Sequence, residues 1–370
     1  MKKIGIVNYH YSNHNYGAVL QAAALHNYVN STLGLQAEHI DYKPPVTVPK
    51  WVVKLKNVIN GYLMDLGVKE KKITHDAFKN PYIFEEFRSE WLPRSKNCFH
   101  SFEVLNRTEF NYTHVIVGSD QVWRPSYTGK SSLVYFLAFL NKNVQKISYA
   151  ASFGNDSWEL PKDETQAIVD EVKTFKAISV RESSGVDICR NTFGIDAEHV
   201  LDPTLLVGRV FFDSIIGKES AKCDSGIVYY KLDIDSKFEK YISDVSKKLA
   251  LPSTNIYYSS YGRAHYYLKV EDWLKEIRDS QIVITDSFHC VCLAILFEKP
   301  FLYYPNDNRG VTRLESLLTL LDLQHHIYRD GMDLIELTHR LTMVDYESVK
   351  EKLLKLRKSS ANFLTNALQS

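Results

Sequence analysis

Residues 282–290 read Ile-Val-Ile-Thr-Asp-Ser-Phe-His-Cys, and this stretch decides the fold of the second half of the chain. Its β-branched start is typical of a strand that is buried on both faces. Polar residues then interrupt the run, and a helical pattern begins at about Phe288. A strand that passes directly into a helix is the repeating unit of a parallel sheet covered by helices.

The same alternation continues along most of the chain and predicts an α/β fold of mainly parallel sheets flanked by helices. The predicted strands are Ile4–Tyr9, Ala37–Tyr42, His114–Val117, Lys146–Ala151, Ala177–Val180, Ile227–Tyr230, Asn255–Tyr258, Ile282–Thr285 and Phe301–Tyr304. The predicted helices are Ala18–Val29, Lys162–Phe175, Asp235–Leu249, Glu271–Asp279, Phe288–Phe297, Thr312–Leu321 and Tyr346–Leu368.

The length of 370 residues predicts two domains, because single hydrophobic cores stop growing at roughly 250–300 residues. The segment Asp202-Pro203-Thr204 is a chain-turning signal, and a new strand pattern follows residue 224. We therefore expect an N-terminal domain over residues 1–205 and a C-terminal domain over residues 206–345. A final helix over residues 346–370 is expected to pack back on the N-terminal domain.

Residues 43–110 fit the alternation poorly, and we predict that they form a helical insertion in the first domain. They contain a basic apolar run, Trp51–Ile59. Two interpretations of that run stay open: a segment that contacts a membrane surface, or a solvated helix packed on the edge of the sheet.

The charge of the chain is close to neutral. Its 45 Lys and Arg residues against 44 Asp and Glu residues give a formal net charge of +1, which argues against a nucleic-acid partner. No stretch approaches the roughly 20 apolar residues that span a bilayer. The five Cys residues are scattered and lack the spacing of a zinc site. We expect a cytoplasmic protein without a metal or cofactor, and peripheral contact with the inner face of the membrane stays open.

Polar residues follow several predicted strands, at the carboxyl ends where open parallel sheets collect their ligands. The first strand leads into a polar loop and a helix that opens with a glycine, a generic site for an anion or a sugar. The strand His114–Val117 is followed by side chains that suit a polyol. A simple helix cap is the alternative in both places. The residues concerned are Asn15, Tyr16, Gly17, Ser119, Asp120, Gln121 and Trp123.

His289 is the candidate for acid–base chemistry. It falls in the first turn of a helix, where the helix dipole disfavours protonation and the carboxylate of Asp286 can offset that effect. An imidazole that titrates near neutrality suits proton transfer, whereas the alternative is a purely structural histidine. Cys290 is conceivable as a nucleophile, but it lies inside a predicted apolar helix.

Three cations are candidates for binding an anion. Arg181 ends the strand Ala177–Val180, where it either pairs with Glu182 or binds a carboxylate or phosphate. Lys299 and Arg313 either bind an anionic ligand or belong to the solvated surface.

Six motifs occur in order along the chain and together resemble the bacterial polysaccharide pyruvyl transferase family, from the first strand to about Leu323. They are Asn15-Tyr16-Gly17-Ala18-Val19-Leu20-Gln21, Gly118-Ser119-Asp120-Gln121-Val122-Trp123, Ser148-Tyr149-Ala150-Ala151-Ser152-Phe153-Gly154, Ser179-Val180-Arg181-Glu182, Leu201-Asp202-Pro203-Thr204 and Thr285-Asp286-Ser287-Phe288-His289.

The resemblance implies a glycosyltransferase-B-like fold with two Rossmann-like domains. It implies an enzyme that moves the enolpyruvyl group of phosphoenolpyruvate onto two hydroxyls of a sugar, in a surface polysaccharide or exopolysaccharide or in its lipid-linked precursor. The products would be a pyruvate ketal and phosphate. In this interpretation His289 and Asp286 are catalytic, and the polar residues that follow the first strand and the strand His114–Val117 bind the acceptor. The implied donor-binding residues are Arg181, Ser287, Arg313 and Lys299.

Two residues depart from the family pattern. Cys290 stands where many members have Gly, and Arg124 stands where Asn is usual, which bears on the donor pocket and the acceptor side respectively.

Two rival functions fit the same pattern, namely a nucleotide-sugar-dependent glycosyltransferase and a non-catalytic module of a polysaccharide assembly complex. The main interpretation requires that Arg181 and His289 face each other across a gap wide enough for phosphoenolpyruvate.

Overall fold

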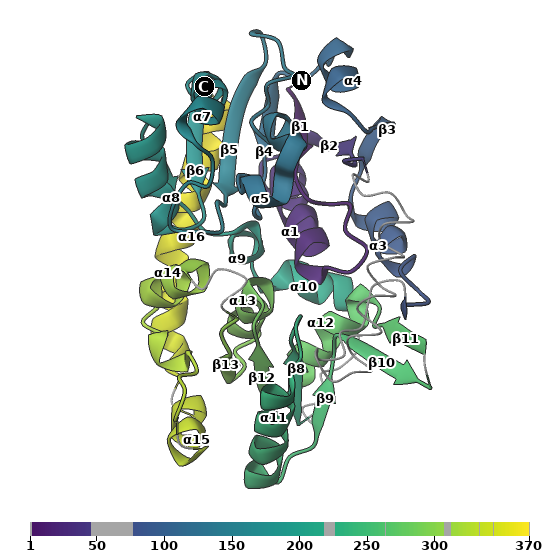
Figure 1. Cartoon of the computed structure of the whole chain (residues 1–370), viewed down its shortest axis with the longest axis vertical. Helices are drawn as coiled ribbons and strands as arrows, with labels where there is room; N and C mark the ends of the chain where they lie inside the picture. Colours follow the sequence, from purple (N-terminus) through teal and green to yellow (C-terminus); the bar gives the residue numbers. More distant parts are fainter. Residues whose placement is uncertain are drawn as a thin grey trace.

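The computed structural model describes residues 2–45, 77–217, 226–262, 264–306, 312–332, 334–342 and 344–369. Figure 1 shows two sheets in the two halves of an elongated molecule, with a long C-terminal helix running beside both. The chain is therefore an α/β protein with two parallel sheets flanked by helices, as its sequence predicts.

The larger sheet has the strand order β3-β2-β1-β4-β5-β6-β7, and each neighbouring pair is parallel. Its strands are β1 Lys3–Val7, β2 Gln36–Tyr42, β3 Arg94–Phe99, β4 His114–Val117, β5 Gln145–Ala151, β6 Ala177–Val180 and β7 Glu198–His199. The smaller sheet has the order β13-β12-β8-β9 and is also parallel. Its strands are β8 Ile227–Tyr230, β9 Ser253–Asn255, β12 Ile282–Thr285 and β13 Phe301–Tyr303.

An antiparallel hairpin, β10 Tyr258–Tyr261 and β11 Ala264–Tyr267, lies outside both sheets. The α-helices are α1 Tyr16–Asn27, α3 Ile83–Trp91, α4 Phe102–Arg107, α5 Pro125–Thr128, α6 Ser132–Tyr135, α7 Lys162–Val172, α8 Ser183–Ile188, α9 Pro203–Val207, α10 Arg209–Ile216, α11 Ser236–Leu249, α12 Val270–Asp279, α13 Phe288–Leu296, α14 Thr312–Leu320, α15 Leu334–Thr342 and α16 Tyr346–Gln369. None of the helices described could cross a membrane, because each is too short or too polar.

Both sheets contain a point where the strand order reverses. In the larger sheet the chain builds β2 and β3 on one side of β1, then crosses to β4 on the other side. In the smaller sheet it places β9 on one side of β8 and β12 on the other. Loops diverge at such a point and leave a crevice beyond the carboxyl ends of the strands, where α/β proteins bind their ligands.

The central strands β1, β4, β8 and β12 are largely buried on both faces. In β4, Val115 and Val117 pack in one apolar cluster of the larger sheet, whereas Ile116 packs in the cluster on the other face. A further cluster joins helix α1 to the smaller sheet, because it contains Leu20 of α1 together with Val228 of β8 and Val283 of β12. Continuous apolar runs are therefore required of these strands, which is why their positions could be predicted.

The predicted helical insertion over residues 43–110 is wrong in part, because β3 adds a parallel strand beside β2. This strand reads Arg-Ser-Lys-Asn-Cys-Phe and has exposed residues at its centre. An edge strand pairs on one side only and tolerates polar side chains, so it lacks the apolar signal of a central strand. The run Trp51–Ile59 lies outside the described residues.

The single strand predicted over Asn255–Tyr258 is also wrong, because β9 ends at Asn255 and β10 begins at Tyr258. The Oδ1 atom of Asn255 accepts a hydrogen bond from the backbone N–H of Tyr257 at 2.8 Å. A side chain that bonds to the backbone two residues ahead turns the chain, as Asn commonly does.

The division into domains stays a prediction. The predicted boundary at 205/206 falls inside α9, which contacts α1 on one side and α13 on the other. At the other end of the chain, Phe363 and Leu364 of α16 share an apolar cluster with Ile4 and Ile6 of β1.

Candidate active site

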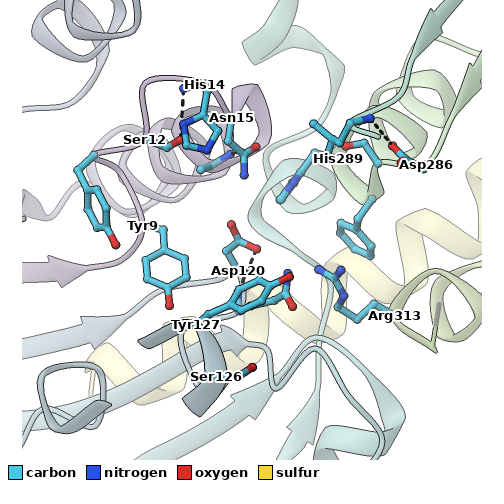
Figure 2. Close-up of a pocket in the computed structure, with 16 residues that line it drawn as sticks. Tyr9, Ser12, His14, Asn15, Asp120, Ser126, Tyr127, Asp286, His289 and Arg313 are labelled. Atoms are coloured by element: carbon cyan, nitrogen blue, oxygen red, sulfur yellow. Dashed lines mark hydrogen bonds between the residues drawn. The ribbon is translucent and has the colours of Figure 1, made fainter. Parts of the chain in front are cut away.

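A pocket of about 510 Å³ lies between the two sheets, beyond the carboxyl ends of strands at both reversal points (Figure 2). The larger sheet contributes residues that follow β1 and β4, namely Tyr9, Tyr11, Ser12, His14, Asn15, Ala18, Asp120, Gln121, Ser126 and Tyr127. The smaller sheet contributes residues that follow β8 and β12, namely Leu232, Asp286, Ser287, Phe288 and His289, and α14 contributes Arg313.

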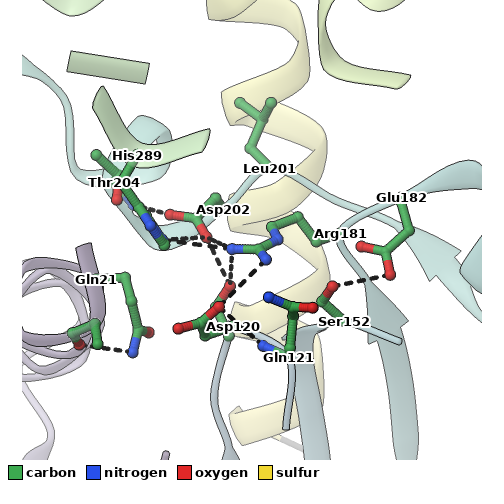
Figure 3. A network of polar contacts seen from close by, with 12 residues as sticks. Gln21, Asp120, Gln121, Ser152, Arg181, Glu182, Leu201, Asp202, Thr204 and His289 are labelled. Atoms are coloured by element: carbon green, nitrogen blue, oxygen red, sulfur yellow. Dashed lines mark hydrogen bonds and ion pairs between the residues drawn. The ribbon is translucent and has the colours of Figure 1, made fainter. Parts of the chain in front are cut away.

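A buried polar network lies at the His289 end of this pocket and crosses between the two halves of the molecule (Figure 3). Arg181 Nη1 donates to Asp202 Oδ2 at 2.9 Å and lies 3.4 Å from Nε2 of His289. The same oxygen of Asp202 accepts from Ser119 Oγ at 2.6 Å and lies 3.6 Å from His289 Nε2. The second terminal nitrogen of Arg181 lies 3.5 Å from Asp120 Oδ1.

Asp202 is therefore the central acceptor of this network. Burial alone would raise the pKa of this carboxyl, but His289 and Arg181 hold it well below its ordinary value. Its other oxygen, Oδ1, accepts from the backbone N–H of Thr204 at 2.8 Å and caps α9. The segment Asp202-Pro203-Thr204, which the sequence marks as a turn, therefore also places the carboxylate of Asp202 beside the imidazole of His289.

The expected gap between Arg181 and His289 is wrong. The two side chains contact each other directly, and Arg181 is buried behind the pocket with its guanidinium 4.3 Å from the ring centre of Phe288. The other interpretation, in which Arg181 pairs with Glu182, is also wrong, because the guanidinium donates to Asp202. Glu182 instead accepts from the backbone N–H of Phe153 at 2.7 Å and holds the loop after β5.

Asp286 lines the pocket, but its carboxylate is engaged on the side of the smaller sheet. Its Oδ2 lies 3.5 Å from Lys231 Nζ and accepts from Asn306 Nδ2 at 3.0 Å, while Oδ1 accepts from the N–H of Leu232 at 3.1 Å. Asp202, rather than the predicted Asp286, supplies the carboxylate that approaches Nε2 of the imidazole. Asp286 is placed to hold the loops after β8 and β12 together.

Gly17 contacts the imidazole directly. A Cβ atom added to Gly17 would lie 2.1 Å from Nδ1 of His289 and 2.6 Å from its Cγ. The glycine at the start of α1 therefore makes room for the imidazole from the other half of the molecule, and this explains its place in the motif.

Two predicted acceptor-binding residues belong to the apolar core. The ring of Tyr16 stacks on Trp273 with ring centres 4.7 Å apart, and its hydroxyl donates to the carbonyl of Leu268 at 2.8 Å. The ring of Trp123 stacks on Phe136, and its Nε1 donates to the carbonyl of Tyr135. Both rings are fully buried, which contradicts a role in contacting a ligand.

Other predicted acceptor residues do line the pocket. Asn15 caps α1 by accepting from the N–H of Ala18 at 3.2 Å. Asp120 has a positive φ of 72°, an uncommon backbone conformation that occurs often at ligand sites. Gln121 follows it, and its Oε1 accepts from Arg124 at 2.8 Å. Ser119 is fully buried and serves the network rather than the pocket.

Some of the predicted donor-binding residues line the pocket and others do not. Arg313 and Ser287 line the pocket, and Ser287 caps α13 through the N–H of Cys290. The pKa of Arg313 is lowered from its ordinary value, mainly because the side chain is buried and also because the guanidinium of Arg181 lies nearby. Lys299 precedes β13 and so lies at the amino end of that strand, whereas the pocket lies beyond the carboxyl ends. Its position contradicts a role in donor binding.

Cys290 is fully buried in the apolar cluster between the sheets, and burial raises the pKa of its thiol to about 12. It is therefore a protonated core residue and neither a nucleophile nor a wall of the pocket. Within the described ranges, no group of three or more His, Cys, Asp or Glu side chains is placed to hold a metal ion.

Sequence reasoning missed the role of Asp202 and the aromatic lining of the pocket, formed by Tyr9, Tyr11 and Tyr127. For Tyr9 and Tyr11 a signal existed, because both lie within four residues of the carboxyl end of β1. Tyr127 lies seven residues beyond Asp120, in the short helix α5, and no local pattern marks it. Arg124, which departs from the family pattern, packs its guanidinium 4.3 Å from the centre of the Tyr127 ring.

The fold and the pocket define a two-lobed α/β protein with a pocket between the carboxyl ends of two parallel sheets. The model of the polysaccharide pyruvyl transferase family matches residues 15–308. This match covers most of the chain, and the chain belongs to that family of transferases.

Among solved structures, UDP-GlcNAc 2-epimerase from Neisseria meningitidis is similar to all of this chain over all of its own length, with 10% identity and a TM-score of 0.47. A mutant of the O-GlcNAc transferase from Thermobaculum terrenum is also similar, with 9% identity and a TM-score of 0.46. The similarity covers all of this chain and 66% of the transferase chain. At such low identity and TM-score we take nothing from them about substrates. No curated protein sequence matches the chain.

Proposed function

We propose that this protein is a pyruvyl transferase that uses phosphoenolpyruvate as donor and two hydroxyls of a saccharide as acceptor. The saccharide would belong to a surface polysaccharide or exopolysaccharide, or to its lipid-linked precursor. The observation that carries the proposal is the shared pocket of Arg313, His289 and the first turn of α13. It supplies a cation, an imidazole and a helix N-terminus together.

An acid phosphate suits this end of the pocket. The first turn of a helix presents N–H groups without intrahelical partners, and the helix dipole favours an anion there. Arg313 adds a guanidinium, which pairs well with a carboxylate or phosphate. We assign both anionic groups of phosphoenolpyruvate to Arg313 and the start of α13, near Ser287.

The reaction needs one proton on carbon and two hydroxyl additions. Protonation of the methylene carbon of phosphoenolpyruvate leaves positive charge on the carbon that bears the phosphate. A sugar hydroxyl adds to that carbon and loses its proton, and the bond to the phosphate oxygen breaks. A second hydroxyl adds to the same carbon and closes the ketal. Of the two hydroxyl protons, one balances the new methyl group and the other leaves on phosphate.

We assign the proton transfer to His289 and the control of its orientation to Asp202. The imidazole lines the pocket while its Nε2 faces Asp202 and Arg181. The hydrogen-bond partners at one ring nitrogen fix the orientation of an imidazole and the nitrogen that carries its proton. Arg181, which is buried behind the pocket, is proposed to hold Asp202 and Asp120 in place rather than to contact the donor.

The test is phosphate release from phosphoenolpyruvate in the presence of a panel of saccharides, with mass spectrometry of the products. We expect one saccharide to gain the mass of a pyruvate ketal as phosphate appears. His289→Ala should lower the rate by about 10²–10⁴-fold, the usual worth of general acid–base help. His100→Ala, at an exposed position, is the matched control and should leave the rate unchanged.

Two results would overturn the proposal. One is the absence of phosphate release with every saccharide of the panel. The other is sugar transfer from a nucleotide sugar supplied to the same panel, which would mark a glycosyltransferase. A His289→Ala variant that keeps the wild-type rate would remove only that residue from the mechanism.

A further inference from the structure

One wall of the pocket is formed by the aromatic ring of Tyr127, on which the guanidinium of Arg124 packs. Tyr127 lines the pocket and is 49% exposed. The guanidinium of Arg124 covers one face of its ring, with 4.3 Å between Cζ and the ring centre. Arg124 itself does not line the pocket, so the pocket meets the part of the ring that Arg124 leaves open.

Arg124 is anchored and its charge is balanced. Its Nη1 donates to Gln121 Oε1 at 2.8 Å, and its Nε lies 3.2 Å from Glu159 Oε1. Glu159 in turn accepts from the backbone N–H of Ser126 at 2.7 Å. The start of α5 and the ring of Tyr127 are therefore held in one orientation before any ligand binds, which lowers the entropy cost of binding.

A second observation points to a ligand at the same wall. Tyr9 packs edge-on against Tyr135 at 5.0 Å and lines the pocket beside Tyr127 (Figure 2). Its hydroxyl oxygen is buried and, among the residues described, has no hydrogen-bond partner. A buried hydroxyl without a partner costs about 1–3 kcal/mol, so a ligand hydroxyl that reached it would be favoured.

The chemistry of this wall selects a neutral polyol. The positive charge of Arg124 is balanced by Glu159 and the carboxylate of Asp120 is paired with Arg181, so neither charge is left to attract an ionic ligand. The face of an aromatic ring is electron-rich and attracts the polarised C–H groups on one face of a pyranose. Asp120 and Ser126 can take hydrogen bonds from the hydroxyls of that sugar.

We propose that Tyr127, Tyr9 and Ser126 form a pyranose-binding subsite in which the sugar stacks on the open face of the Tyr127 ring. The sugar held there is the acceptor, and in this respect the inference rests on the proposed function. The residues of the subsite follow β1 and β4 of the larger sheet, whereas His289 follows β12 of the smaller sheet and Arg313 lies in α14. The acceptor sugar is thus held mainly by the larger lobe and the imidazole comes from the smaller one.

The experiment measures binding rather than turnover. The probes are the methyl glycosides of glucose, galactose, mannose and N-acetylglucosamine, followed by saturation-transfer NMR with the full chain. Phosphoenolpyruvate is titrated separately by calorimetry. We expect at least one glycoside to bind, with the strongest transfer to the C–H protons of one ring face.

The variants separate the ring from its hydroxyl. Tyr127→Ala should weaken the affinity for that glycoside about tenfold, the loss expected for one aromatic contact, while Tyr127→Phe keeps it within about threefold. Tyr9→Phe should weaken it severalfold. Tyr261→Ala removes a more exposed tyrosine from the hairpin β10–β11 and should change nothing. The affinity for phosphoenolpyruvate should stay within about twofold of the wild-type value in all four variants.

The outcomes distinguish the subsite from the reaction. Failure of every glycoside to bind, or unchanged affinity in Tyr127→Ala, would overturn the subsite even where phosphate release occurs. Glycoside binding that depends on Tyr127, in a protein that never releases phosphate from phosphoenolpyruvate, would support the subsite and refute the proposed reaction.

Discussion

At the scale of single residues, the site depends on how closely Gly17 and His289 approach each other across the two lobes. Gly17 lies in α1, its φ is not in the left-handed region, and its α-carbon abuts the imidazole. Glycine is therefore required at position 17 because there is no space for a Cβ atom beside the imidazole, and not because of the backbone conformation. Because alanine favours a helix over glycine by about 1 kcal/mol, substitution there should not weaken α1 itself.

Gly17→Ala is therefore expected to leave a folded protein with a displaced imidazole. The new methyl group would overlap Nδ1 of His289, and a displacement of about 1 Å at a catalytic group can cost roughly 10²-fold in rate. Phosphate release and the melting temperature measure the two effects. Gly185→Ala is the control, since its methyl group would meet Val180 at 3.1 Å, away from the pocket. An unchanged rate in Gly17→Ala would show that the position of His289 does not matter.

At the scale of elements, α3 supports the loop between β1 and α1 that forms part of the pocket. Arg88 of α3 is almost fully buried. Its Nη1 donates to the carbonyl of Ser12 at 2.7 Å, and its Nη2 donates to Asn13 Oδ1 at 2.6 Å. Glu85, on the same helix, holds the guanidinium in place. A residue from the poorly patterned region 43–110 thus orders a wall of the pocket.

Arg88→Met should loosen this loop without dissolving the fold. Hydrogen bonds to a charged group contribute about 1.5–3 kcal/mol each, so local opening of residues 8–15 should increase roughly tenfold or more. Hydrogen exchange, followed by mass spectrometry of the peptides covering this loop, measures the effect independently of activity. Arg94→Met is the matched control, because Arg94 of β3 pairs with the same Glu85. Equal exchange in both variants would contradict the assignment.

At the scale of the whole molecule, α16 connects the two sheets. Near its start, Lys350 pairs with Glu298 beside the smaller sheet at 2.9 Å. Near its end, Leu364 packs under β1, and the carbonyl of Leu368 accepts from Lys2 at 2.7 Å. Figure 1 shows the helix running along both halves. It therefore contributes to the relative placement of the lobes that enclose the pocket.

Leu364→Ala should destabilise the protein by about 2–5 kcal/mol, because it leaves a cavity in the core under β1. Leu354→Ala on the same helix is the control: Leu354 is 63% exposed, and its loss should change the free energy of unfolding by no more than about 0.5 kcal/mol. Urea unfolding at constant m-value measures both. Similar losses in the two variants would show that α16 is not anchored through its buried face.

Much of the fold could be predicted because buried strands carry a local signal. The bounds of β4, β6, β8 and β12 agree with the predicted runs, since each is apolar on both faces and ends at polar residues. The polar edge strand β3 and the turn at Asn255 carried no such signal. Pairing on one side and a side-chain bond to the backbone do not require apolar residues.

For the site, the sequence by itself determined which loops of one sheet meet, because residues after the carboxyl ends of parallel strands share one edge. Asn15 and Asp120, which follow β1 and β4, lie in the pocket for that reason, whereas His289 comes from the other sheet. Only the tertiary structure decided that Asp202 faces the imidazole and that the ring of Tyr16 belongs to the core. Whether a side chain enters a pocket or a core depends on its packing against segments far away in the chain, and no local pattern contains that information.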